Sequence, residues 1–232
     1  MKNQDGQILM PASELEYKVN KNTGTSWTRN DNFDENGYVK VKDLYDIEPL
    51  YESPPMERGL FHYQEGSIDN FKYWENEEQC PGSLARYYHP KYKKVHNNLR
   101  KKIEEILGRT LYTTYYYDRF YFVGNDLPIH TDRFSCEISV SINISTNIKD
   151  PWPLWVRTPS GEDRSINLEP GDGLIYKGCE RPHWRDAMPD GPKVLFGKSP
   201  EYYYHQVFFH YVLQDGQRAH YAWDKSIDLP MI

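Results

Sequence analysis

Two hydrophobic patterns follow each other along this chain, one typical of a helix and one typical of strands. In the segment "HPKYKKVHNNLRKKIEEILGR" (residues 89–109), apolar side chains recur at spacings of three and four. Pro90 suits a first helical turn and Gly108 is a natural helix end. We expect the neighbouring histidines His89 and His96 on the polar side. The pattern predicts a flanking helix near residues 90–107, whose apolar stripe is formed by Tyr92, Val95, Leu99, Ile103 and Ile106.

Beyond residue 108 the hydrophobic period changes to that of strands. The segment "CEISVSINIS" alternates strictly between polar and apolar residues, and "TLYTTYYYDRFYFV" is rich in β-branched and aromatic residues. The segments "PLWVRTP" and "SINL" flank a Ser-Gly turn and predict a hairpin, while "GLIYKG" and "YHQVFFHYVL" predict two more strands. Strands at regular spacing without helices between them indicate a sandwich or barrel, so the predicted fold class is mainly β with flanking helices.

The front of the chain carries a weaker signal. Residues 1–75 are polar, rich in turn formers and interrupted by prolines, with "YVKVKDLY" as a possible strand. Scattered aromatic residues in this part indicate packing on a core rather than a separate domain. We therefore expect residues 1–75 to form an extended N-terminal arm or lid, and residues 76–232 to form the core, which carries the flanking helix.

Composition excludes several classes of function. The net charge of −6 argues against a general electrostatic grip on nucleic acid or on an anionic membrane. Cys80, Cys136 and Cys179 are odd in number and widely spaced, so they form neither a disulfide framework nor a CxxC zinc pair. No apolar run is long enough for a membrane span or a signal peptide. The expected location is the cytoplasm, and the oligomeric state is left open.

One group of residues has the spacing of a metal site. His130 and Asp132 stand one residue apart at the entrance to the alternating strand, and His183 follows a later turn–strand–turn segment. Two histidines and one carboxylate on one face can hold iron and leave three coordination positions open. A His-x-Asp triplet alone arises easily by chance in a chain with eight histidines. Loop residues without metal, or a structural metal in a binding protein, therefore remain open at this point.

These residues resemble the iron(II)- and 2-oxoglutarate-dependent oxygenases, and in particular their prolyl 4-hydroxylase-like branch. The resemblance covers about residues 110–215, and the residues that carry it are Tyr121-x-x-Gly124-x-x-Leu127-x-x-His130-x-Asp132 and Pro170-Gly171-Asp172. It implies a double-stranded β-helix (jelly roll), with Fe(II) held by His130, Asp132 and His183. It also implies 2-oxoglutarate as co-substrate and dioxygen as oxidant, used to hydroxylate a substrate. Beyond the metal ligands, no catalytic residue is expected.

The chain departs from this family at the anchor for 2-oxoglutarate. Members usually place an Arg or Lys on the strand after the distal histidine, but "YYYHQVFFHYV" contains neither. His205 stands near the expected position. Arg185 lies two residues beyond His183, so both side chains face the same side of a strand, and a guanidinium can grip a carboxylate with two hydrogen bonds. Arg119 or Lys193 is a further alternative, and Tyr121 is expected to contribute its hydroxyl.

Two possible functions, one enzymatic and one not, follow from this resemblance. The first is a mononuclear iron oxygenase that couples decarboxylation of 2-oxoglutarate to hydroxylation. The second is a non-catalytic cupin or jelly-roll binding protein, whose metal is structural or absent. Asp132 argues against a halogenating variant, because that chemistry in relatives needs the carboxylate position vacant. A small molecule or a peptide is expected as the substrate, and the barrel motifs do not choose between them, because function resides in the loops.

Overall fold

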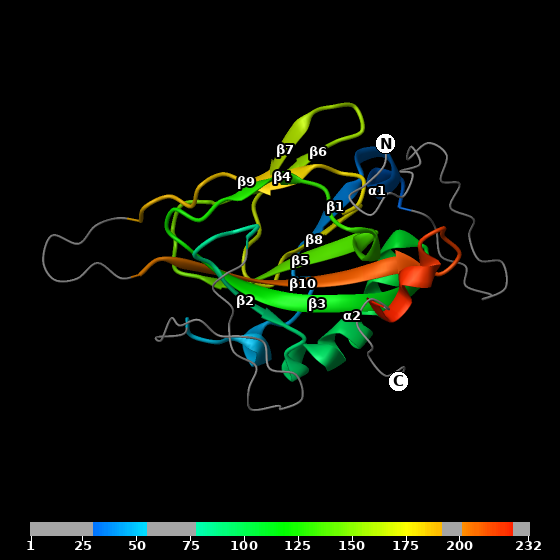
Figure 1. Ribbon diagram of the computed structural model, residues 1–232, viewed down its shortest axis with the longest axis horizontal. Helices are drawn as coiled ribbons and strands as arrows, with labels where there is room; N and C mark the ends of the chain where they lie inside the picture. The colour runs from blue at the N-terminus through cyan, green and yellow to red at the C-terminus, as the bar shows by residue number, and fades with distance from the viewer. Residues whose placement is uncertain (1–29, 55–77, 192–200, 225–232) are drawn as a thin grey trace, which may run out of the picture.

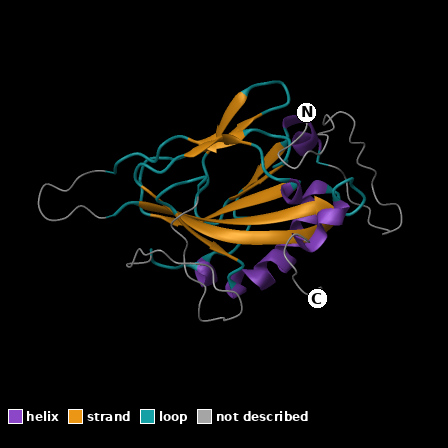
Figure 2. Cartoon of the chain, viewed as in Figure 1, coloured by secondary structure: helices purple, strands orange, loops and turns teal. Residues whose placement is uncertain are grey.

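Two antiparallel sheets face each other in the computed structural model, which describes residues 30–54, 78–191 and 201–224 (Figures 1 and 2). In order across the larger sheet, the strands are β1 (Tyr38–Val41), β8 (Gly173–Tyr176), β5 (Ile138–Thr146), β10 (Tyr203–Leu213), β3 (Leu111–Phe122) and β2 (Leu84–Tyr87). Across the smaller sheet they are β4 (Leu127–His130), β9 (His183–Arg185), β6 (Leu154–Arg157) and β7 (Asp163–Ile166). The predicted mainly β fold class with flanking helices is confirmed.

Five helices complete the described part of the chain. They are α1 (Asp31–Asn36), α2 (Pro90–Leu107) and the short 3-10 helices η2 (Glu48–Leu50), η4 (Phe134–Cys136) and η5 (Ala219–Asp224). In Figure 1, α2 runs along the side of the larger sheet that faces away from the smaller sheet. No helix among the residues described is long and apolar enough to cross a membrane.

The strict alternation of β5 gives this strand two different faces. Its apolar side chains (Ile138, Val140, Ile142 and Ile144) belong to the core between the larger sheet and α2. Its small polar side chains before the register shift (Ser139, Ser141 and Asn143) are also buried, on the opposite face toward the smaller sheet. The interior between the two sheets is thus lined by polar groups, which is the setting that a polar site requires.

Helix α2 forms where its apolar period predicts. It starts at Pro90 and ends before Gly108, which has the left-handed φ of 63° and bonds through its N–H to the Glu104 carbonyl. The expectation for His96 was wrong, because its side chain is buried between the helix and the sheet rather than on the polar side. Its ring centroid lies 4.7 Å from that of Tyr211, and its Nε2 lies 3.0 Å from the carbonyl of His210.

Buried His96 should make the protein less stable in acid. Burial is the main cause that lowers the pKa of His96 to about 3 from 6.5. Below pH 6.5 the unfolded chain therefore binds a proton that the folded chain does not. This costs up to about 1.4 kcal/mol of unfolding free energy per pH unit as the pH falls toward the folded-state value. We expect His96→Phe to flatten the pH dependence of urea unfolding between pH 6.5 and 4; an unchanged slope would contradict this account.

Part of the front segment is built into the larger sheet. Strand β1 lies within the predicted "YVKVKDLY" strand and pairs antiparallel with β8, with Tyr38 opposite Tyr176 and Val41 opposite Gly173. A Cβ at Gly173 would overlap the side chain of Leu44, so this glycine lets Leu44 pack closely against β8. Most of residues 1–75 lie outside the described ranges, so the division into an arm and a core stays a prediction.

Candidate metal centre

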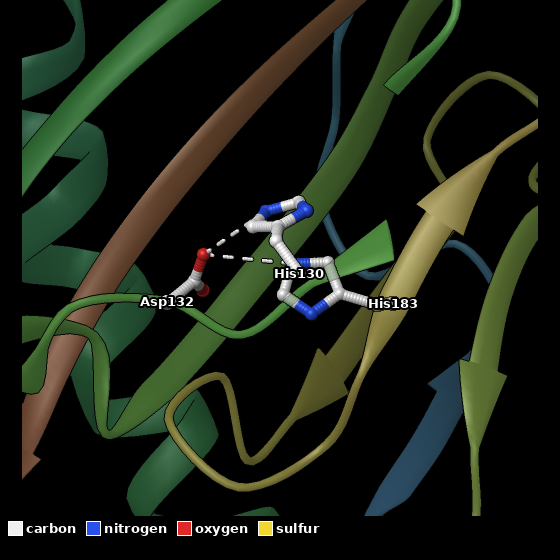
Figure 3. A group of neighbouring side chains, drawn as sticks. All are labelled: His130, Asp132 and His183. Atoms are coloured by element: carbon white, nitrogen blue, oxygen red, sulfur yellow. Dashed lines mark ion pairs between the residues drawn. The ribbon is translucent and has the colours of Figure 1, made fainter. Parts of the chain in front are cut away.

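Two neighbouring strands and the turn after one of them bring the predicted ligands together. Strands β4 and β9 pair antiparallel, and His130 stands directly opposite His183. Asp132 follows β4 by two residues, and its backbone N–H donates to the carbonyl of Gly178 at 2.9 Å. One ligand atom from each of the three side chains lies within 4.8 Å of the other two (Figure 3). Residues far apart in sequence thus converge on one point.

Both imidazole rings are held in the orientation that a ligand needs. Nδ1 of His130 lies 2.8 Å from the Pro128 carbonyl, and Nδ1 of His183 lies 2.9 Å from the Arg181 carbonyl. A carbonyl oxygen only accepts hydrogen bonds, so each Nδ1 carries the proton and each Nε2 presents a lone pair. Outer hydrogen bonds of this kind fix the tautomer and ring direction of metal-binding histidines.

The separations between the donor atoms fit a single ion. Nε2 of His130 lies 3.6 Å from Oδ1 of Asp132, and Nε2 of His183 lies 3.5 Å from the same oxygen. Two atoms that each bind one ion at about 2.1 Å can be at most about 4.2 Å apart. The donor set of two neutral nitrogens and one carboxylate oxygen suits iron and related first-row metals.

Charge and exposure also suit a metal site that ligands can reach. Burial would raise the pKa of Asp132, but the neighbouring imidazoles of His183 and His130 hold it well below its ordinary value. The carboxylate is therefore ionised, as a metal ligand must be. The side chain of His130 is 21% exposed, whereas that of His183 is 3% exposed. The cluster is thus more open to solvent on the His130 side.

Arg185 lies in the interior beside this cluster, as its strand parity predicts. His183 and Arg185 are both buried, while Trp184 between them is only half-buried. Two residues along a strand correspond to about 7 Å. The Arg185 guanidinium donates to the carbonyl of Trp152 and to Oε1 of Gln206, the latter at 3.0 Å. Both acceptors are neutral, so this buried cation has no carboxylate partner in the part of the chain that the structure describes.

Aromatic rings enclose the guanidinium of Arg185. Its central carbon lies 4.4 Å from the ring centroid of Trp152, 4.7 Å from that of Tyr204 and 5.9 Å from that of Tyr121. Cation–π contacts stabilise a buried guanidinium only in part, because they do not replace a counter-ion. The surroundings of Arg185 therefore favour an anionic ligand.

Tyr121 and Arg119 approach the same interior space from β3. The Tyr121 hydroxyl accepts a hydrogen bond from Nη1 of Arg119 at 3.1 Å, and both side chains are fully buried. Burial raises the pKa of Tyr121, although Arg119 opposes this shift, so the phenol stays neutral and can donate its own proton. The structure thus brings Tyr121, Arg119 and Arg185 into one neighbourhood. Lys193, the remaining alternative anchor, lies outside the described residues.

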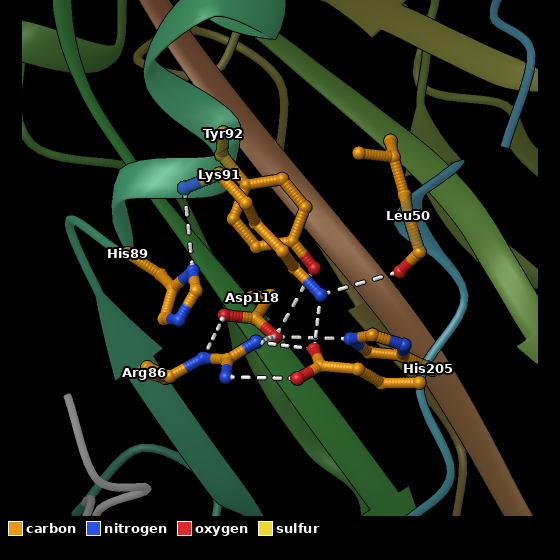
Figure 4. Close-up of polar contacts among 8 residues, drawn as sticks. Leu50, Arg86, His89, Lys91, Tyr92, Asp118 and His205 are labelled. Atoms are coloured by element: carbon orange, nitrogen blue, oxygen red, sulfur yellow. Dashed lines mark hydrogen bonds and ion pairs between the residues drawn. The ribbon is translucent and has the colours of Figure 1, made fainter. Parts of the chain in front are cut away.

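His205 does not join this group, so its predicted placement was wrong. Its side chain lies on the other face of β10, where Nε2 lies 2.9 Å from Oδ2 of Asp118 (Figure 4). There the ring also stacks on Phe120, with the ring centroids 3.9 Å apart. Successive strand residues point to opposite faces. The side chains of Tyr204 and Gln206 therefore face the interior, and Gln206 contacts Arg185 there.

The surroundings of His205 form a structural ion network. Asp118 accepts two hydrogen bonds from Arg86, at 3.1 and 2.9 Å, and Glu52 pairs with both Arg86 and Lys91. Carboxyl and imidazole atoms of Glu52, Asp118 and His205 lie close enough for a metal. However, two cationic side chains already balance the two carboxylates. The network instead ties the segment around Glu52 to the sheet; no sequence motif indicated it.

Comparison with known proteins shows the fold. No protein-family model and no curated protein sequence matches this chain. Among solved structures, an oxidoreductase of the 2OG-Fe(II) oxygenase family from Burkholderia pseudomallei matches with a TM-score of 0.55 and 11% identity, over 78% of this chain and 86% of that one. A Pseudomonas putida prolyl-4-hydroxylase matches with a TM-score of 0.50 and 14% identity, over 78% and 95%.

A third structure, HygX from Streptomyces hygroscopicus with nickel and 2-oxoglutarate bound, matches with a TM-score of 0.50 and 10% identity, over 77% of this chain and 84% of that one. The first of these structures is of the 2OG-Fe(II) oxygenase family, the second is a prolyl-4-hydroxylase, and the third contains bound 2-oxoglutarate. The chain therefore has the double-stranded β-helix fold of these enzymes, as the sequence resemblance predicts.

Proposed function

We propose that this protein is a mononuclear Fe(II)- and 2-oxoglutarate-dependent oxygenase that hydroxylates an organic substrate. The observation that carries the proposal is the cluster of His130, Asp132 and His183. His130 and His183 present oriented Nε2 atoms to one oxygen of Asp132, inside a fold shared with oxygenases of this type. Three ligands on one face leave three positions for a chelating co-substrate and for dioxygen.

The proposed anchor for 2-oxoglutarate is Arg185. A dicarboxylate that chelates a metal through one end must place its far carboxylate deeper in the interior. Arg185 stands about 7 Å along the strand from His183, and its hydrogen-bond partners among the described residues are neutral. A far carboxylate would give this buried guanidinium a counter-ion, which the described part of the chain does not provide. The Tyr121 hydroxyl, which can donate, is proposed as a second contact to the same carboxylate.

When bound, Fe(II) with 2-oxoglutarate would supply a two-electron oxidation: dioxygen is consumed, a substrate C–H bond becomes C–OH, and 2-oxoglutarate becomes succinate and carbon dioxide. The chain's own residues fix geometry and exclude water. His130, Asp132 and His183 fix the ion, and Arg185 fixes the co-substrate. Trp152, Tyr204 and Phe208 belong to one buried aromatic cluster, which keeps the interior dry. The proposed substrate, a small molecule or a peptide, would enter from the His130 side.

The proposal is tested by product formation. Purified protein with Fe(II), 2-oxoglutarate and dioxygen should form succinate slowly even without the true substrate, because such oxygenases turn over their co-substrate uncoupled. Removing the metal with a chelator should stop succinate formation, and adding Fe(II) back should restore it. Succinate can be measured by mass spectrometry. A jelly-roll binding protein, the alternative function, would form no succinate with or without metal.

A further inference from the structure

The two carboxylate oxygens of Asp132 have different surroundings. Oδ1 is the oxygen that lies 3.6 and 3.5 Å from Nε2 of the two histidines. Oδ2 lies on the other side and accepts a hydrogen bond of 2.8 Å from the hydroxyl of Ser139. Ser139 belongs to the polar face of β5 and is fully buried. Oδ1 thus faces the two histidines, and Oδ2 faces Ser139.

His210 stands behind Ser139 and fixes the direction of its hydroxyl. Nδ1 of His210 lies 3.0 Å from Oγ of Ser139. The Ser139 hydroxyl has two possible acceptors, Oδ2 of Asp132 at 2.8 Å and the Cys136 carbonyl at 3.3 Å. The carboxylate is nearer and ionised, so Ser139 donates its single proton to Asp132. The hydroxyl oxygen must then accept from His210, which therefore carries its proton on Nδ1. The His210 ring is buried and stacks on Tyr115 at 4.4 Å, which holds it in place.

A glycine makes room for this arrangement. Asp132 Oδ2 and Ser139 Oγ both lie where a Cβ on Gly178 would be, as does the carbonyl of Cys136. Any larger residue at position 178 would therefore push the carboxylate or the hydroxyl away. The same glycine accepts the Asp132 backbone N–H through its carbonyl. Gly178 thus helps to fix both the side chain and the backbone of Asp132.

We infer that Ser139 and His210 are positioning residues that make Asp132 bind its metal through Oδ1 alone. A carboxylate that used both oxygens would occupy two positions of a six-coordinate ion. Only two positions would then stay open beside the histidines, too few for a chelating dicarboxylate and dioxygen together. Holding Oδ2 on Ser139 keeps the third position open. This inference rests on the proposed function, and neither residue carried a metal-site signal in the sequence.

The first test compares two serines on the same face of one strand. Ser139→Ala removes the hydrogen bond to Asp132, whereas Ser141→Ala makes the same change two residues along β5, at a buried position without a hydrogen bond to Asp132. In the full-length chain, Ser139→Ala should lower Co(II) affinity about tenfold or more, as is usual for lost outer contacts. It should also change the Co(II) absorption spectrum. Ser141→Ala removes no hydrogen bond to Asp132, so its Co(II) affinity and absorption spectrum should match those of the unmodified chain.

The second test varies the group behind Ser139 and covers the case in which Ser139→Ala folds poorly. His210→Phe keeps a ring against Tyr115 but has no donor for the Ser139 hydroxyl. His210→Asn places an amide N–H near the position of Nδ1 and so retains the donor. We expect His210→Phe to weaken Co(II) binding about fivefold, the effect of one ordinary hydrogen bond, and His210→Asn to restore it. Thermal melting would verify that each variant is folded.

The outcomes separate this inference from the function on which it rests. If the unmodified chain takes up no Co(II), the metal centre is refuted and the positioning role with it. If the unmodified chain binds one Co(II), and Ser139→Ala binds it with the same affinity and spectrum, only the positioning role is overturned. Equal affinities for His210→Phe and His210→Asn would remove His210 from the arrangement and leave Ser139 acting alone.

Discussion

Asp132→Ala is expected to reduce the metal content of the purified protein from one divalent ion per chain to nearly none. Asp132 provides the only anionic donor of the cluster, and its Oδ1 is the atom that both histidine Nε2 atoms face. Without it, two neutral imidazoles remain, one of them partly exposed. The fold should survive, because Asp132 follows the end of β4 and does not belong to the main core. Metal content after dialysis against Mn(II) or Fe(II) measures the effect.

An exposed carboxylate in the same segment provides the control. Asp126→Ala removes one negative charge from the turn before β4, where the side chain is exposed. This variant should keep one metal ion per chain, so a general effect of charge is separated from loss of a ligand. His130→Ala and His183→Ala should resemble Asp132→Ala. One metal ion per chain at unchanged affinity in all three variants would place the metal elsewhere.

The convergence of His130, Asp132 and His183 could be predicted because these residues obey local rules. His130 and Asp132 lie just before the strand that the alternating pattern predicts. His183 follows a turn, a short strand and a second turn, which also can be recognised in the sequence. The long strand β5 was visible because its alternation extends over many residues, and β3 and β10 were visible because they are rich in β-branched and aromatic residues. Strand β2 has four residues and no alternation of burial, and β3 is its one partner among the strands described. Nothing in its own sequence separates it from a loop.

The error at His205 has a physical cause in the burial of β10. Side chains alternate between the two faces of a strand, but all 11 residues of β10 are buried. Polar and apolar residues therefore do not mark its two faces, so the sequence could not decide which of the neighbours His205 and Gln206 faces the interior. The structure places Gln206 there and His205 against Asp118.

The arrangement of Ser139 and His210 was also beyond the sequence. These residues lie on adjacent strands, with His210 directly opposite Ser139 in the antiparallel pairing of β10 and β5. Alternation does place Ser139 on the polar face of its strand. Whether that face meets a carboxylate depends on how the turn after β4 folds back over it, and that is a long-range property.

Arg185→Met is expected to weaken the binding of 2-oxoglutarate by two decades or more, while metal affinity barely changes. The methionine side chain can still pack against the rings of Trp152 and Tyr204, but it has no charge and no donors. Removing one partner of a desolvated ion pair costs about 3–5 kcal/mol, which corresponds to two or more decades in affinity. Titration with 2-oxoglutarate in the presence of Mn(II) measures the change.

Two further variants identify the anchor by its chemistry. Arg185→Lys keeps the charge but cannot form a bidentate pair of hydrogen bonds with a carboxylate. Its affinity for 2-oxoglutarate should therefore lie between that of the unmodified chain and that of Arg185→Met. His205→Ala should leave the affinity nearly unchanged, because His205 faces Asp118 on the far side of β10. If Arg185→Met binds 2-oxoglutarate as the unmodified chain does and Arg119→Met does not, the anchor is Arg119. The co-substrate would then reach toward β3, where Arg119 already contacts Tyr121, rather than along β9.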